Sequence, residues 1–145
     1  MKLVVQRVKK ASVAVNGEVV SSIEKGLLVL LGITGADTKN EANFLAEKLV
    51  KLRVMADSMG KMNLSVKDVN AEILIVSQFT LYSDTKGGNR PSFITAARPE
   101  VAEPLYNQFV EKVKSLGVTV GTGKFGHEMK IEAELDGPVT ILMEN

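Results

Sequence analysis

Polar groups interrupt an apolar run where the segment Glu72 to Leu81 (EILIVSQFTL) reaches its end. Ser77 and Thr80 contribute hydroxyl groups, Gln78 contributes an amide, and the backbone of Phe79 and Thr80 adds N–H donors. Together they offer hydrogen-bonding chemistry, with no thiol and no metal, at the end of an expected strand. By themselves, these residues fit an ordinary polar strand end better than a site.

Two further groups of residues could take part in chemistry. Lys86 to Phe93 reads KGGNRPSF, in which glycines permit close approach of the backbone and cations can contact phosphate, although an ordinary flexible loop has the same composition. In Gly137-Pro138, a cis peptide bond would turn two neighbouring carbonyl oxygens the same way, but most X-Pro bonds are trans. Neither group identifies a function on its own.

The sequence lacks the residues of several common catalytic sites. It contains no cysteine and a single histidine, His127, which excludes disulfides, thiolate zinc sites, a thiol nucleophile and a site of several imidazoles. No phosphate-binding loop, dinucleotide fingerprint or HExxH pattern occurs. We therefore expect no cofactor and no metal, and we expect His127 to be an ordinary surface residue.

Length and composition favour one folded domain over residues 1–145, with 45% hydrophobic and 24% charged residues. The formal net charge of +1 gives no argument for nucleic-acid binding, so any RNA contact must be local. The apolar start is cut by Arg7, Lys9 and Lys10, unlike a signal peptide, and Gly26 to Ile33 is too short to span a membrane. We expect a cytoplasmic protein with no membrane segment.

Many strands and two helices must position these groups. Asn16-Gly17 between valine-rich runs predicts a hairpin, and the continuous apolar run Gly26 to Ile33 predicts a central strand that is covered on both faces. Amphipathic helices are expected over Thr38 to Arg53 and Pro99 to Leu116. Further strands are expected over Glu72 to Leu81, Val118 to Thr122, Glu128 to Leu135 and Val139 to Glu144. The elements do not alternate regularly, so we predict an α+β fold, a largely antiparallel, barrel-like β-sheet with two main helices packed on it.

Taken together, the three groups resemble the D-aminoacyl-tRNA deacylase family, also known as the D-tyrosyl-tRNA(Tyr) deacylase family. The resembling motifs are SQFTL at Ser77 to Leu81, RPSF at Arg90 to Phe93, and Gly-Pro-Val-Thr at Gly137 to Thr140. The resemblance extends over the whole chain, from the VVQRV opening to the run Gly121 to Gly126. The chain departs from the family at His127 and at Leu135-Asp136, which affects the expected rim of the pocket and not the motifs.

The resemblance implies a homodimer that hydrolyses the ester at the 3′ end of aminoacyl-tRNA. Its active site would lie at the interface, where the Gly137-Pro138 corner of one protomer enters the pocket formed by Ser77 to Thr80 of the other. The family's Gly-Pro bond is cis, and its two carbonyl oxygens would contact the substrate's amino group and α-hydrogen while clashing with an L side chain. D-Aminoacyl-tRNA and mischarged glycyl-tRNA would therefore pass this filter.

The resemblance also implies roles for individual residues. Phe125 and Met129 would wall the pocket near the terminal adenosine, Arg7 would brace the Gly137-Pro138 corner, and Gln78 would orient the ester. Arg90 would contact the substrate. Phosphate contacts are further considered for five cations, each of which also fits a simple surface role: Lys9, Lys10, Lys86, Arg90 and Lys124.

Two mechanisms for the ester cleavage are open. Thr80 could act as a nucleophile, or a water molecule could attack with help from the 2′-hydroxyl of the substrate. We favour water, because no base is evident in the SQFT segment to activate a hydroxyl. In both cases the N–H groups of Phe79 and Thr80 are candidates for stabilising the oxyanion.

Two other functions remain compatible with the sequence. One is a non-catalytic RNA-binding module, whose hydroxyl-rich segment is structural. The other is a hydrolase of free D-amino acid esters or D-peptides that needs no RNA, which the basic loop makes less favourable.

Overall fold

The sheet is organised around one long strand, β1 (Lys2–Val15). In the computed structural model, which describes residues 1–145, β1 pairs antiparallel with β2 (Glu18–Ile23), β3 (Gly26–Gly32) and β8 (Lys130–Glu144). The turn between β1 and β2 contains Asn16 and Gly17, both at positive φ, as a tight hairpin turn requires. The predicted hairpin is confirmed, and residues 2–15 before its turn form a single strand.

The rest of the sheet is parallel. β3 pairs in parallel with β6 (Glu72–Ser77), which pairs in parallel with β7 (Val120–Thr122), giving the order β2-β1-β3-β6-β7. A helix lies between β3 and β6 in the chain and another between β6 and β7, and such crossovers return the chain in the same direction. The predicted α+β, barrel-like class with two main helices is therefore confirmed, and its sheet is mixed. A separate small hairpin, β4 (Met55–Ala56) with β5 (Met62–Leu64), had no counterpart in the sequence prediction.

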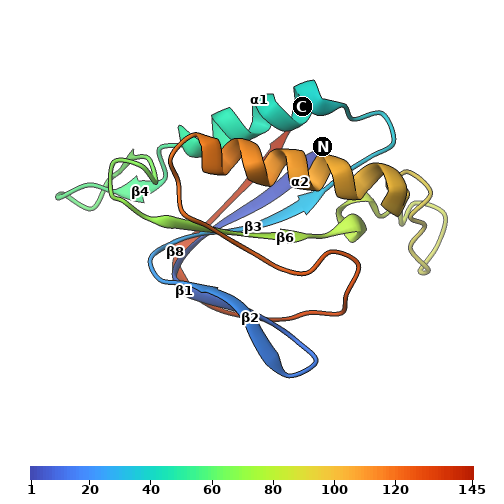
Figure 1. Ribbon diagram of the computed structural model, residues 1–145, viewed down its shortest axis with the longest axis horizontal. Helices are drawn as coiled ribbons and strands as arrows, with labels where there is room; N and C mark the ends of the chain where they lie inside the picture. Colours follow the sequence, from blue (N-terminus) through green and yellow to red (C-terminus); the bar gives the residue numbers. More distant parts are fainter.

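Both helices cover the same face of the sheet, where they lie side by side (Figure 1). α1 (Lys39–Val50) begins after Thr38, whose side chain and that of Glu41 form a reciprocal capping box. α2 (Pro99–Ser115) has proline at its first position and buries Phe109 completely. Both predicted helices are confirmed to within a few residues at their ends. No helix combines the length and the apolar character that a membrane crossing needs.

The core has two parts, one on each face of the sheet. The larger cluster lies between the sheet and the helices and includes Leu27, Val29 and Leu31 of β3. The smaller cluster, on the opposite face, includes Leu28 of the same strand. Because its side chains alternate between two apolar layers, β3 needs no polar face, and this explains its continuous apolar sequence.

Two segments differ from the predicted strands in ways that shape the site. β6 ends at Ser77, and the chain continues as a 3₁₀ helix, η1 (Phe79–Tyr82), after a last bond from the N–H of Gln78 to the carbonyl of Leu31 at 2.8 Å. The two strands expected over 128–135 and 139–144 form the single strand β8. Its pairing with β1 jumps from Leu135 opposite Val8 to Thr140 opposite Gln6, so residues 136–139 bulge outward, with Gly137-Pro138 at the corner of the bulge.

Candidate active site

A cavity of about 690 Å³ lies beyond the end of β6. Its walls come from Ser77, Gln78 and Phe79 on one side, from the start of α2, and from the segment 125–129, which precedes β8 in the chain. Figure 1 shows the loop that leads into β8 on the side of the sheet away from the helices. Most of the lining residues are hydrophobic. The cavity brings together five of the residues singled out in the sequence: Ser77, Gln78, Phe79, Phe125 and Met129.

Within the SQFT segment, the side chains of Gln78 and Thr80 are bonded to each other. The Gln78 amide nitrogen Nε2 donates to the Thr80 hydroxyl oxygen Oγ1 at 2.6 Å. Thr80 is half-buried and does not line the cavity, whereas the ring of Phe79 is exposed and packs edge-on against Phe93 with ring centres 5.2 Å apart. The RPSF motif therefore reaches the cavity through Phe93, and the exposed Arg90 does not line it.

Gly32 at the end of β3 lets the SQFT segment approach the sheet. A Cβ atom at this position would lie 3.1 Å from the carbonyl oxygen of Gln78 and 2.9 Å from the Cβ of Leu81. Backbone and Cβ atoms at these distances leave no space for a side chain. The position of η1 therefore depends on a glycine that none of the sequence motifs includes.

The opposite wall is held by aromatic and sulfur packing. Phe125 contacts the ring of Tyr106 with centres 5.8 Å apart, and the Tyr106 hydroxyl donates to the carbonyl of Ile75 at 2.8 Å. Burial raises the pKa of Tyr106, so this hydroxyl stays a hydrogen-bond donor. Met129 packs on Gly123, where a Cβ atom would lie 2.5 Å from its sulfur.

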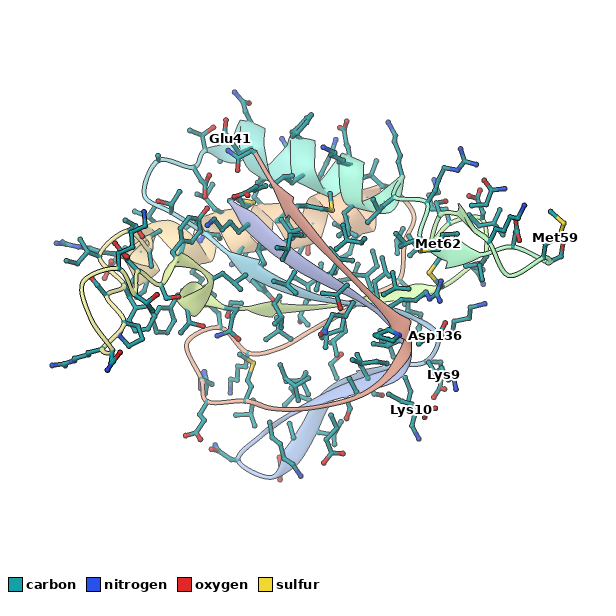
Figure 2. The ribbon with its side chains drawn as sticks, turned by 180° about the vertical axis from the view of Figure 1, so that it is seen from behind. Lys9, Lys10, Glu41, Met59, Met62 and Asp136 are labelled. Atoms are coloured by element: carbon teal, nitrogen blue, oxygen red, sulfur yellow. The ribbon has the colours of Figure 1, made fainter.

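The Gly137-Pro138 corner lies apart from this cavity within one chain. The peptide bond is cis, and neither residue lines the cavity. Arg7 reaches the residue before the corner: its Nε donates to the carbonyl of Asp136 at 3.2 Å and lies 3.0 Å from the Oδ2 of its carboxylate, while Nη1 donates to the carbonyl of Val54 at 2.7 Å. Figure 2 shows Asp136 where β8 bends.

The candidate phosphate-binding cations differ in their surroundings. Lys9 and Lys10 both form ion pairs with Glu134, at 3.3 and 3.7 Å. Their charge is therefore partly neutralised. Lys86, Arg90 and Lys124 are exposed and form no ion pair.

Several lining residues were not assigned to a site from the sequence, and three of them carry ionisable or charged side chains: Arg98, His127 and Glu128. His127, expected as an ordinary surface residue, is exposed but lines the cavity, and its Nδ1 lies 3.0 Å from the carbonyl of Phe125. Arg98 lines the cavity from the start of α2. The only signal for Arg98 was its place directly before a predicted helix. No group of three His, Asp or Glu side chains lies close enough together to hold a metal ion.

Known proteins resemble this chain over nearly its whole length. The family model described as D-Tyr-tRNA(Tyr) deacylase matches residues 4–144. The D-aminoacyl-tRNA deacylase of Desulfatibacillum aliphaticivorans is 54% identical over 100% of this chain and 99% of its own length, and that of Geobacillus sp. (strain WCH70) is 52% identical over 100% and 95%.

Two solved structures share the fold of this chain. The c-Myc DNA unwinding element binding protein has a TM-score of 0.95 and 45% identity, over 100% of this chain and 99% of its own. A probable eukaryotic D-amino acid tRNA deacylase has a TM-score of 0.86 over 98% and 97% of the two chains; at 17% identity it supports the fold alone. The chain is thus an enzyme of the hydrolase class that acts on ester bonds. It belongs to the D-aminoacyl-tRNA deacylase family.

Proposed function

We propose that this chain hydrolyses the ester bond between a D-amino acid and the 3′ end of tRNA, releasing the free D-amino acid and the tRNA. The observation that carries the proposal is the cavity, where Ser77, Gln78 and Phe79 face an apolar wall in a chain whose full length matches D-aminoacyl-tRNA deacylases. The polar end suits the ester group. The apolar wall, with Phe125 and Met129, suits the terminal adenosine and the amino-acid side chain.

The complete active site is proposed to form between two copies of the chain. The Gly137-Pro138 corner of one protomer would enter the cavity of its partner, because within one chain it lies outside the cavity and its side of β8 exposes apolar groups such as Leu142. Arg7 would hold the corner in place through its two contacts with Asp136. Each protomer would then complete the site of the other, as a two-fold dimer allows.

Chirality would be read by main-chain atoms at this corner. The carbonyl oxygens of Gly137 and Pro138 would contact the amino group and the α-hydrogen of a D-residue, and the side chain of an L-residue would collide with them. A filter that works by steric rejection admits glycine, so mischarged glycyl-tRNA is a second proposed substrate. The filter makes no demand on the nature of the D side chain.

Water is proposed as the nucleophile. Its oxygen would bond to the ester carbon, the bond to the ribose 3′-oxygen would break, and a proton would pass to that oxygen with help from the neighbouring 2′-hydroxyl. The first N–H groups of η1, those of Phe79 and Thr80, have no partner within that helix and would stabilise the oxyanion. One such donor contributes roughly 10²–10³ in rate.

Replacing Thr80 by valine should leave most of the deacylation rate intact. The Thr80 hydroxyl receives a hydrogen bond from the Gln78 amide, which cannot accept a proton, so nothing in this contact activates it as a nucleophile. We expect kcat for D-aminoacyl-tRNA to fall by less than about tenfold, the range of one lost neutral hydrogen bond. A folded Thr80→Val protein with no turnover, or an acyl-enzyme trapped on the native protein, would contradict the water mechanism.

The proposed function is tested by amino-acid release from D- and L-aminoacyl-tRNA that carry the same side chain. With enzyme at substoichiometric concentration, we expect repeated turnover of the D form and of glycyl-tRNA, and slow release from the L form. Equal hydrolysis of D and L forms would indicate an unselective esterase. Binding without turnover would indicate a non-catalytic RNA-binding module, and equally fast hydrolysis of a simple D-amino acid ester would indicate an esterase that needs no RNA.

A further inference from the structure

The cavity lining contains one permanently cationic side chain, that of Arg98, which belongs to none of the family motifs. It is the single arginine or lysine among the lining residues, and it is exposed. Its side chain forms no capping bond and no ion pair within the chain. By contrast, the other arginines near the sheet, Arg7 and Arg53, donate to backbone carbonyls. Arg98 is therefore a free guanidinium at the edge of the proposed active site.

The backbone holds Arg98 in a fixed place while its side chain remains free. Its carbonyl accepts hydrogen bonds from the N–H groups of Val101 and Ala102, at 3.0 and 2.9 Å, and the preceding Ala97 donates to the carbonyl of Ile33 at 2.9 Å. These bonds tie the start of α2 to the end of β3. The start of α2 itself offers few free N–H donors, because Pro99 has no N–H and the N–H groups of Val101 and Ala102 are bonded to the Arg98 carbonyl. Any attraction for an anion at this place comes mainly from the guanidinium.

We propose that Arg98 binds a phosphate of the RNA backbone next to the terminal adenosine. The inference rests on the proposed function. It assigns a binding residue to the phosphate, the part of the same substrate that the proposed function does not yet place. Apolar walls would accommodate the adenosine and the amino acid, and Ser77 to Phe79 face the ester. The other candidate phosphate-binding cations do not line the cavity, so Arg98 is the one cation of the lining that can take the adjacent phosphate. A guanidinium matches phosphate oxygens with two parallel hydrogen bonds.

The charges of the lining also give the substrate a direction. Glu128 is the single carboxylate of the lining and belongs to the segment 125–129, whereas Arg98 belongs to the start of α2. A phosphate is repelled by the first and attracted by the second. The first turn of α2 carries the exposed carboxylate of Glu100, so the attraction is confined to Arg98 itself. The RNA strand would therefore leave the cavity past Arg98 and not along the segment 125–129.

The test compares two substrates, D-aminoacyl-tRNA and the matching 3′-D-aminoacyl ester of adenosine, which has no phosphate. For Arg98→Ala, the ratio of the KM for the tRNA to the KM for the adenosine ester should rise by about tenfold, as expected for one lost charge-assisted contact. The slope of log KM against log salt concentration for the tRNA should become shallower by about one. Arg98→Lys should recover part of the ratio, because it restores the charge without the planar fork.

Lys114→Ala is the matched control, since it removes an exposed cation from the other end of α2 and should change neither the ratio nor the slope. An equal rise in both KM values for Arg98→Ala, or an unchanged salt slope, would overturn the phosphate assignment. The proposed function fails in a different way, namely if the native protein does not hydrolyse D-aminoacyl-tRNA at all.

Discussion

Replacement of Gly137 by valine is expected to lower kcat/KM for D-aminoacyl-tRNA by at least about a hundredfold, the effect of displacing a positioning group by roughly 1 Å. Gly137 has a φ of +136°, which L side chains rarely adopt, and an added Cβ would lie 2.7 Å from the backbone nitrogen of Val139. The corner must therefore shift. It bulges outward from the β1–β8 pairing, so the fold should survive.

Gly117→Val is the control for backbone strain. Gly117 also has a positive φ, +85°, but it follows the end of α2 and has open space around it. This variant should lose about 1–2 kcal/mol of stability, the cost of an L side chain in the left-handed region, and keep its activity. Thermal unfolding and kcat/KM are measured for both variants. If Gly137→Val remains folded and as active as Gly117→Val, the corner has no role in the site.

Mixed dimers test whether the corner acts on the partner subunit. Met129→Arg fills the cavity with a long cation, and Gly137→Val displaces the corner. A heterodimer with one change in each subunit keeps one intact site and should have about half of the native activity. A heterodimer of a native subunit with a doubly changed subunit should be inactive. If instead the first heterodimer is inactive and the second keeps about half of the native activity, each site is formed by the corner and the cavity of the same chain.

Local sequence signals predicted the elements whose structure depends on neighbouring residues. The hairpin follows from Asn16-Gly17, since both residues must have positive φ, and the start of α1 follows from Thr38 and Glu41 at capping-box spacing. The central position of β3 follows from its continuous apolar side chains. In each case the determining contacts are short-range or depend on periodicity.

Strand direction was not predictable in the same way. The apolar pattern of β6 shows that the strand is buried, but it does not show whether the neighbouring strand runs with it or against it. The end of β6 depends on Gln78, whose N–H still bonds to Leu31 before the chain turns into η1. A register between distant strands sets that boundary, so the polar residues after Ser77 were assigned to the strand.

The candidate site was predictable where its residues form short motifs. Ser77 to Phe79 belong to the SQFTL motif, whereas Phe125 and Met129 were expected only because the family resemblance implies them, and all five line one cavity. Arg98 and Gly32 belong to no motif. They reach the site only because β3 ends beside both η1 and the start of α2. Contacts of this kind exist only after the chain has folded.

The second large effect is expected for Gly26→Ala, which should lower the free energy of unfolding by at least about 3 kcal/mol, the upper range for overpacking. Gly26 begins β3 directly opposite Glu72 of β6, and an added Cβ would collide with the backbone carbonyl of Glu72. A backbone atom cannot rotate away as a side chain can. The two strands must separate, and the buried face they share loses its packing.

Gly35→Ala is the matched control, since a Cβ at Gly35 meets nothing within 4 Å and its φ is unexceptional. It should change stability by no more than about 0.5 kcal/mol. Urea unfolding of both variants gives the comparison, and equal stabilities would show that β3 and β6 have room to separate. Because the same pairing ends with Leu31 opposite Ser77, any Gly26→Ala protein that stays folded should also have a lower kcat/KM. Glycines at the two ends of β3, Gly26 and Gly32, would thus determine where the SQFT segment meets the substrate.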